Sequence, residues 1–301
     1  MLSDELDVEL PALADLAVSI YLPQQTFATT THVLGLTTTY VSPTGDHTQA
    51  VAMPVSAIST SWYFLTAVDV LTPSGSSAIV AIGDSITDGF GSTVDSNARW
   101  PSVLAARLQA RSDLRHLAVL NQGIGGNRAL FDTFGPGLLS RLDRDLLRVP
   151  GAKFAIVLIG TNDIGIPSAF GRLHEEASAV DIISGLKQVI ARVRGRDISV
   201  IAGTLPPFAN ATMPGFYTPQ GEAKRQVVNE WIRNGNEFDG MVDFDEVLRD
   251  PANPATLLSS YDCGDHLHPS NAGYRAMADA FDLSLFHSTR IRPSLSGSAL
   301  P

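Results

Sequence analysis

Residues 78–87 read Ala-Ile-Val-Ala-Ile-Gly-Asp-Ser-Ile-Thr, and this stretch decides the fold. The five apolar residues at its start, 78–82, form a short unbroken run that predicts a fully buried strand. Ser85 follows the end of that strand, two residues after Gly83 and ahead of a segment compatible with a helix. Enzymes with α/β folds present nucleophiles at such strand-to-helix turns. Ser85 is therefore the first candidate for a catalytic residue.

Strands and helices alternate through the rest of residues 76–289. Strands are predicted at 78–82, 117–121, 154–159, 198–204 and 241–244, and helices at 100–110, 137–147, 179–194, 221–233 and 271–285. A loop containing Gly and Pro is expected from 160 to 171. This alternation predicts an α/β fold whose parallel sheet is covered by helices on both faces. Right-handed connections place the carboxyl ends of the strands on one rim, where open α/β sheets bind ligands.

Residues 1–75 are rich in β-branched and aromatic residues and show no helical period. Strands are predicted at 16–22, 32–41 and 61–71, with turns between them. A free-standing sandwich usually needs about seven strands. We therefore interpret residues 1–75 as a smaller β-rich N-terminal region, an incomplete sandwich, ahead of a catalytic α/β domain at 76–289. A Ser- and Pro-rich tail at 290–301 is expected to be loosely ordered.

The β-rich region is expected to pack on the α/β domain and to leave an exposed strand edge. A second copy of the chain would cover this edge in a homo-oligomer, and the alternative is an extension that only shields one side. Trp62 and Tyr63 are neighbours in the sequence, and neighbouring residues of a strand face opposite sides. They do not form a flat aromatic platform by themselves, so we expect them to pack in a core.

Composition excludes several classes of partner. The chain has 301 residues, 44% of them hydrophobic and 17% charged, as in ordinary globular proteins. Its formal net charge of −10 argues against binding to nucleic acid or to an anionic membrane, since both require dense Lys and Arg. No apolar run approaches the roughly 20 residues that span a membrane. The single cysteine, Cys263, excludes an intramolecular disulfide.

The N-terminal residues indicate the cellular compartment in which the protein is expected. Residues 1–7 are acidic and lack the basic and apolar regions of a signal peptide. The stretch predicts a cytoplasmic protein, and secretion is the alternative, because large secreted bacterial enzymes also do without disulfides.

Three further segments can join Ser85 on the rim of the sheet. They read Gly-Ile-Gly-Gly-Asn at 123–127, Gly-Thr-Asn-Asp at 160–163 and Asp-His-Leu-His-Pro at 265–269. The first two follow the ends of predicted strands, and the third lies just before the last helix. All of them can therefore converge on one site, which is the strongest argument from the residues alone.

The residue types in these segments suit acyl transfer. A serine hydroxyl is a weak nucleophile at neutral pH and needs an adjacent base, for which His268 is the candidate. Asp265 lies three residues earlier, close enough to orient the imidazole and to stabilise its charged form. A tetrahedral oxyanion needs preorganised donors. The Ser85 N–H, the Gly126 N–H and the side-chain amide of Asn162 are expected to form that oxyanion hole.

Structural roles are the alternatives for several of these residues. Ser85 could only cap the following helix, and Asn162 with Asp163 could only form an Asx turn. Asp84 is expected to anchor the turn through hydrogen bonds. The convergence of the four segments favours catalysis over these readings.

Other side chains near His268 were weighed for the same chemistry. Asp262 could replace Asp265 as the acid, although it is farther from the histidine in the sequence. His266 is expected on the surface, and Cys263 is expected to be a packing residue. His266, His268 and Asp265 together could suggest a metal site, but the serine set explains them better, so no metal is expected.

The four blocks together resemble those of the SGNH hydrolases, also called the GDSL esterase/lipase family, over roughly residues 78–287. Gly83-Asp84-Ser85 resembles the nucleophile block, Gly126 the oxyanion glycine, residues 160–163 the asparagine block and 265–269 the acid–base block. The resemblance implies a flavodoxin-like three-layer fold with strand order 2-1-3-4-5. It also implies metal-independent and cofactor-independent ester hydrolysis through an acyl-serine intermediate.

The substrate expected from these observations is a small-molecule or sugar ester with a short, acetyl-like acyl group, because no stretch announces a lid or a long apolar channel. Residues 164–176 could shape the acyl pocket, with Ile166, Pro167 and Phe170 as its walls. The alcohol could be a sugar or an aryl group. Acyl transfer to an alcohol or peroxide is a second function for the same residues. A third is a carbohydrate deacetylase that residues 1–75 direct to a glycan.

Overall fold

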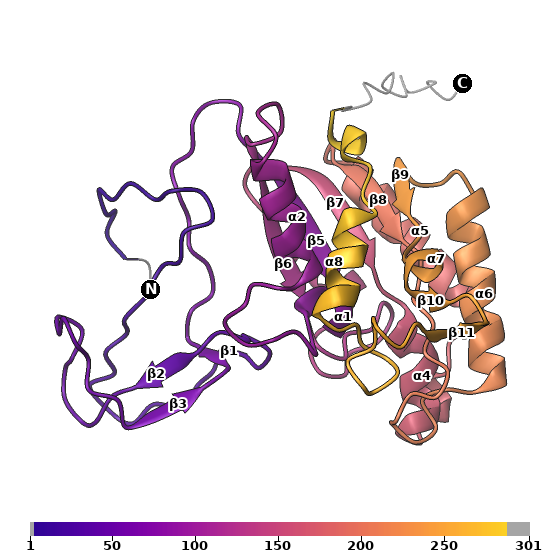
Figure 1. Ribbon diagram of the computed structural model, residues 1–301, viewed down its shortest axis with the longest axis horizontal. Coiled ribbons are helices and arrows are strands. Elements are labelled where there is room, and N and C mark those ends of the chain that lie inside the picture. The colour runs from indigo at the N-terminus through magenta and orange to yellow at the C-terminus, as the bar shows by residue number, and fades with distance from the viewer. Residues whose placement is uncertain (1–2, 288–301) are drawn as a thin grey trace, which may run out of the picture.

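A five-stranded parallel sheet forms the centre of the α/β domain in the computed structural model, which describes residues 3–287 (Figure 1). The order in the sheet is β6-β5-β7-β8-β9, and all four pairings are parallel. The bounds are Ser77–Gly83 (β5), Leu117–Gly123 (β6), Ala152–Leu158 (β7), Ser199–Gly203 (β8) and Gly240–Val242 (β9). The expected order 2-1-3-4-5 is confirmed.

Two groups of helices flank this sheet. In one group α2 (Trp100–Gln109), α7 (Phe244–Leu248) and α8 (Asn271–Asp279) pack in series. In the other, α5 (Ala179–Arg194) packs against both α3 (Leu138–Leu142) and α6 (Pro219–Asn234). Figure 1 shows α2 and α8 in front of the strands. The remaining elements are α1 (Ser85–Asp88), the π-helical turn Asp143–Leu147, α4 (Thr161–Ala169), the 3-10 helices Leu173–Glu175 and Leu283–Phe286, and the hairpin of β10 (Arg249–Asp250) and β11 (Asn253–Leu257).

Helix α5 shows how the sequence specifies one of these elements. Ser178 accepts a hydrogen bond from Asp181 N at 3.1 Å, and Asp181 accepts one from Ser178 N at 2.9 Å, which completes a capping box. Ile182, Leu186 and Val189 follow at helical spacing and are buried. The helix therefore begins at a strong cap and presents one apolar face to the sheet.

Residues 31–63 form two short antiparallel ribbons. β1 (Thr31–His32) pairs with β4 (Trp62–Tyr63), and β2 (Thr39–Val41) pairs with β3 (Ala57–Ser59). The region is β-rich as expected, but its strands are shorter than predicted. The prediction of a strand at 16–22 was wrong, because apolar side chains there, such as Leu16 and Ile20, stay about half exposed and find no partner strand. The expected exposed edges belong to β2 and β3, and their pairing with a second copy stays a prediction.

Two predictions within the α/β domain were also wrong. The loop expected at 160–171 is largely helix α4, because burial of Ile164 and Ile166 outweighs the Gly and Pro residues of this segment. The last helix was predicted to reach residue 285 but ends at Asp279, and Asp282 then caps a separate 3-10 turn. The tail predicted at 290–301 lies outside the described residues. Among residues 3–287, helices are too short or too polar to cross a membrane.

Candidate active site

Ser85 stands at a tight turn between β5 and α1. A Cβ at Gly83 would come within 2.3 Å of the Leu158 carbonyl oxygen and 2.4 Å of Thr87 Oγ1, so only glycine fits there. Asp84 caps α1 by accepting a hydrogen bond from Ile86 N at 3.0 Å. Asp84 thus anchors the turn, as expected, and it does so by capping α1, so the hydroxyl of Ser85 is left for another partner.

That partner is His268. Its Nε2 lies 2.8 Å from Ser85 Oγ, and its Nδ1 lies 2.6 Å from Asp265 Oδ2. The other oxygen of Asp265 accepts hydrogen bonds from the N–H groups of Leu267 and His268 at 2.9 and 2.8 Å. Burial opposes ionisation of Asp265, but the hydrogen bond and charge of His268 outweigh it and lower the pKa of this carboxyl. A charged carboxylate, an imidazole and a hydroxyl therefore stand in line.

The other side chains weighed from the sequence do not take part in this line, although the Cys263 thiol lies beside Asp265. Asp262 accepts a hydrogen bond from His266 Nδ1 at 2.5 Å, so this pair is separate, and the His266 side chain is 49% exposed. Burial raises the pKa of the Cys263 thiol to about 11, which keeps it protonated and weakly nucleophilic at neutral pH. Potential metal-ligand atoms of Asp262, Cys263 and Asp265 lie within 4.8 Å of one another. Because each carboxylate already faces a histidine and the thiol keeps its proton, these residues fit a metal poorly.

The expected oxyanion donors lie at the N-terminal ends of two helices and on one loop. The N–H of Ser85 is the first of α1 and has no partner within its own helix. Gly126 has φ of +71°, and a Cβ there would meet the ring of Phe134 at 2.3 Å. Asn162 is the second residue of α4, and its Nδ2 donates to the carbonyl of Asn127 at 3.0 Å. The structure therefore joins the glycine and asparagine segments directly.

A buried polar layer that the sequence did not reveal supports these loops. The guanidinium of Arg141 is completely buried and donates to the carbonyls of Gly83 and Gln122 at 2.9 and 2.8 Å. It also donates to Asn127 Oδ1 at 3.0 Å. One side chain thus ties together the ends of β5 and β6 and the loop that carries Gly126. No motif marks Arg141, since an arginine in a helix is ordinarily a surface residue.

Two buried aspartates complete this layer. Burial raises the pKa of Asp84 to about 7, against the opposing hydrogen bond from Ile86 N. Burial likewise raises the pKa of Asp163 to about 6, although Asp163 accepts hydrogen bonds from Ala129 N and Leu130 N at 2.7 and 3.1 Å. These carboxyls hold backbone in place beneath the site and do not contact Ser85 Oγ in the hydrogen-bond network.

Aromatic side chains border the cleft that contains Ser85 and His268. The ring of Phe90 lies against the His268 ring, with centroids 4.2 Å apart. The rings of Phe134 and Phe170 meet edge to face, with centroids 6.0 Å apart. Phe134 is 59% exposed and Phe170 is 50% exposed. Phe170 thus lines the cleft as expected, whereas Ile166 is only 2% exposed and contributes a small part of the wall. Phe90 and Phe134 were missed because no spacing rule links them to the four segments.

Comparisons with known proteins bear on the family and the fold of the chain. A family model described as the GDSL-like lipase/acylhydrolase family matches residues 81–276. Similar solved structures include LAE5, described as an alpha/beta hydrolase from the Lake Arreo metagenome (26% identity, TM-score 0.52, 70% of this chain and 95% of that chain). Another is the M. smegmatis aryl esterase (20% identity, TM-score 0.52, 68% of this chain and 96% of that chain). A third is a mutant of Axe2, an acetylxylan esterase from Geobacillus stearothermophilus (22% identity, TM-score 0.51, 69% of this chain and 93% of that chain). Comparison with curated protein sequences gives no significant match.

Proposed function

This chain belongs to the GDSL-like lipase/acylhydrolase family, and we propose that it is a serine esterase that hydrolyses short-chain, acetyl-like esters. The observation that carries the proposal is the line of contacts from Ser85 Oγ to His268 Nε2 at 2.8 Å and from His268 Nδ1 to Asp265 at 2.6 Å. This is the geometry that a nucleophile, a general base and an orienting acid require.

In the proposed first step, Ser85 Oγ attacks the carbonyl carbon of the ester while its proton passes to His268 Nε2. The carbonyl oxygen becomes an oxyanion, which the N–H groups of Ser85 and Gly126 and the amide of Asn162 stabilise. His268 then gives its proton to the oxygen of the leaving alcohol as the carbon–oxygen bond breaks. The acyl group remains on Ser85 as an ester.

In the second step, water attacks the acyl-serine carbonyl and passes a proton to His268. The new tetrahedral intermediate collapses, the carboxylic acid leaves, and the proton returns to Ser85 Oγ. Asp265 stays ionised throughout and stabilises the imidazolium of His268, which agrees with the lowered pKa of its carboxyl. In these two steps, Ser85 is the only residue that forms a covalent bond to the acyl group.

The walls of the cleft support the proposed substrate class. Phe134 and Phe170 present apolar surface beside Gly126, and Phe90 lies along His268. Such walls suit a compact apolar acyl group or an aryl alcohol, whose rings can pack on them. The names of the similar aryl esterase and acetylxylan esterase give the two alcohols to compare, an aryl group and a sugar.

Glycan targeting by the N-terminal region receives less support. Trp62 packs edge to face on His32 at 5.5 Å, and the hydroxyl of Tyr63 bonds Ser59 Oγ at 3.0 Å. The expectation that these two residues pack in a core was wrong, because Trp62 is exposed and both lie outside the hydrophobic core. Their contacts are with neighbours in the N-terminal ribbons, and they do not form a flat platform for sugar rings. Acyl transfer to an alcohol or peroxide uses the same residues as hydrolysis and differs only in which nucleophile attacks the acyl-serine.

The test is turnover of p-nitrophenyl acetate, butyrate and octanoate and of acetylated xylo-oligosaccharide by the purified chain. We expect the acetyl and butyryl esters to be cleaved fastest. Ser85→Ala should remove nearly all turnover, while Ser184→Ala, on the outer surface of α5, should keep it. Equal turnover by Ser85→Ala and the intact chain would overturn the proposal. Added alcohol that raises ester product over hydrolysis would identify acyl transfer instead.

A further inference from the structure

The loop that carries Gly126 lies directly against α1. A Cβ at Gly123 would come within 2.2 Å of Asp88 N, so the two backbones touch. Asn121 Nδ2 donates to the carbonyl of Thr87 at 2.8 Å, and the N–H of Gly125 donates to Asp88 Oδ2 at 3.0 Å. Asp88 is therefore the side chain that holds the residue just before the oxyanion glycine.

The second oxygen of Asp88 faces the N-terminal region. His32 Nε2 lies 2.7 Å from Asp88 Oδ1, and the Asp88 side chain is only 2% exposed. A carboxylate so buried requires partners for its oxygens, and a charged acceptor makes the hydrogen bond from Gly125 stronger. Arg99 Nη1 is a more distant partner, at 3.9 Å. His32 is thus the closest hydrogen-bond partner of the Asp88 oxygen that faces away from Gly125.

His32 is itself fixed by its surroundings. It sits in β1 opposite Trp62 of β4, whose ring it meets edge to face. Leu34, two residues later, reaches the oxyanion loop: its Cδ1 would be 2.9 Å from a Cβ at Gly125. Arg99 donates hydrogen bonds to the carbonyls of Leu34 and Gly35. The segment is therefore clamped between its own ribbon and the α/β domain.

These contacts matter because the oxyanion donor lies in a flexible sequence. Gly125 and Gly126 are consecutive glycines, which have a wide choice of backbone angles when nothing restrains them. The Gly126 N–H belongs to the peptide that joins these two residues, so its direction depends on where Gly125 is held. An oxyanion hole acts only when its donors are already aimed at the place where charge develops.

We propose that His32 and Asp88 are positioning residues for the oxyanion hole, through which the N-terminal β-rich region completes the active site of the α/β domain. The hydrogen on His32 Nε2 points to Asp88 Oδ1, and Asp88 Oδ2 receives the N–H of Gly125. Leu34 covers Gly125 from the other side. This proposal rests on the proposed esterase function, since it concerns the donor that would stabilise the ester oxyanion.

The test uses the full chain with His32→Ala and His32→Gln, and with Thr38→Val as a matched control. Thr38 also joins the N-terminal region to the α/β domain, through hydrogen bonds to Asp95 at 2.7 and 2.5 Å, but it does not touch Asp88. We expect His32→Ala to lower kcat for p-nitrophenyl acetate by about tenfold or more at nearly unchanged KM, because an interaction made mainly in the transition state is weakened. His32→Gln, whose amide can donate to Asp88, should restore most of that loss.

A binding measurement separates positioning from simple loss of packing. A trifluoromethyl ketone, which forms an oxyanion on Ser85, should bind His32→Ala more weakly in proportion to the loss in kcat/KM. Unchanged kcat in His32→Ala, or an equal loss in Thr38→Val, would overturn the proposal. Thermal unfolding of each variant shows whether the folded fraction accounts for any change.

A readout that does not need activity distinguishes this proposal from the proposed function. In protein labelled with 15N-glycine, Asp88→Asn and His32→Ala should each move the Gly125 amide resonance and speed its hydrogen exchange. If the intact chain cleaves no ester but these shifts occur, the esterase function fails and the contact to Gly125 stands. If the intact chain cleaves esters and neither the resonance nor kcat changes, the positioning role fails.

Discussion

The side-chain amide of Asn162 donates one hydrogen to the carbonyl oxygen of Asn127, 3.0 Å away. The amide has two hydrogens, so one remains for a ligand, and the first fixes the plane in which the second points. Asn162 also lies in the first turn of α4, where the helix dipole favours negative charge. One residue thus combines an oriented donor with a favourable local field, which is what an oxyanion requires.

Replacing Asn162 with Ala is therefore expected to lower kcat for acetyl esters by about 10²-fold or more, the usual loss for one oxyanion donor. KM should change little, because the donor acts mainly on the transition state. Asn234→Ala is the matched control, since Asn234 is an exposed asparagine of α6 that bonds Glu230. Steady-state kinetics on both variants checks the prediction, and equal rates for the two would contradict a role for Asn162.

Asp84 is expected to make stability depend on pH. Burial raises the pKa of its carboxyl from 3.8 to about 7, with the charge of Asp163 adding to the effect and Arg141 opposing it. Between these values the native state holds a proton that the unfolded state has lost, so this residue reduces stability as pH rises through that window. Asp84→Asn retains an oxygen for Ile86 N and removes the titration.

The free energy of unfolding of Asp84→Asn, relative to the intact chain, should thus increase by about 2–3 kcal/mol from pH 5 to pH 8. Urea unfolding at the two pH values measures this difference. A difference that stays constant with pH would show that Asp84 does not titrate in this range.

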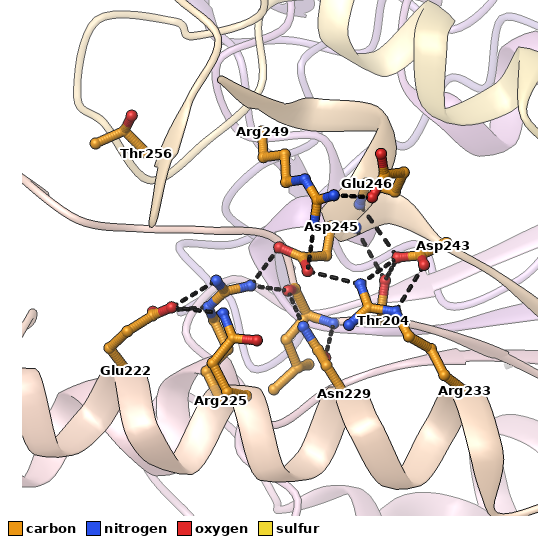
Figure 2. A network of polar contacts seen from close by, with 12 residues as sticks. Thr204, Glu222, Arg225, Asn229, Arg233, Asp243, Asp245, Glu246, Arg249 and Thr256 are labelled. Atoms are coloured by element: carbon orange, nitrogen blue, oxygen red, sulfur yellow. Dashed lines mark hydrogen bonds and ion pairs between the residues drawn. The ribbon is translucent and has the colours of Figure 1, made fainter. Parts of the chain in front are cut away.

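Figure 2 shows a second buried network, centred on Arg225 of α6 and Asp245 of α7. Arg225 donates to Asp245 at 2.5 Å and to the carbonyl of Leu205 at 2.9 Å, and its side chain is completely buried. Asn229 Oδ1 accepts a hydrogen bond from Leu205 N, and Asn229 Nδ2 donates one to the Leu205 carbonyl. The network therefore fixes the chain where it leaves β8, far along the sequence from the serine.

Arg225→Met is expected to lower the free energy of unfolding by about 1–3 kcal/mol, because Asp245 Oδ1 and the Leu205 carbonyl each lose a buried hydrogen-bond donor, while Arg233 stays 2.6 Å from Asp245 Oδ2. Urea unfolding is the measurement. Arg111→Met provides the control, since Arg111 pairs with Asp113 on the surface and its loss should change stability little. Similar urea midpoints for Arg225→Met and Arg111→Met would show that the buried network contributes no more to stability than the surface ion pair.

Self-association is expected to depend on the β2–β3 ribbon. Tyr40 and Ile58 pair across this ribbon and are 58% and 69% exposed, beside strand edges that lack a neighbour in residues 3–287. A second copy would cover them. Sedimentation velocity should show a homo-oligomer that Ile58→Lys shifts toward monomer. A monomer for the intact chain at all concentrations would contradict the prediction.

The sequence specifies the parts of this molecule that depend on local pattern. The apolar run at 78–82 is a buried strand, and the segments around Ser85, Asn162 and His268 meet on one rim because parallel strands end there. Tertiary contacts decided the rest. Helix α4 forms despite Pro167, since its apolar residues are buried, and Arg141 and Phe90 acquire their places only when distant segments come together.

In the N-terminal region, local pattern predicted a strand that the structure does not contain. β-branched and apolar residues at 16–22 match a strand in pattern, yet a strand also needs a neighbour, and none pairs with it among the described residues. His32 shows what pattern cannot supply at all. Its partner Asp88 lies 56 residues away, and no spacing in the sequence indicates that the two meet.

The central claim is that Ser85 is the nucleophile of an esterase, and labelling by a fluorophosphonate tests it most directly. Such a reagent forms a bond to a serine oxygen that a base has activated, with loss of fluoride. The account predicts one label per chain, on the peptide that contains Ser85, with parallel loss of p-nitrophenyl acetate turnover and with little labelling of His268→Ala. Esterase activity that persists in fully labelled protein, or a label on another residue, would contradict it.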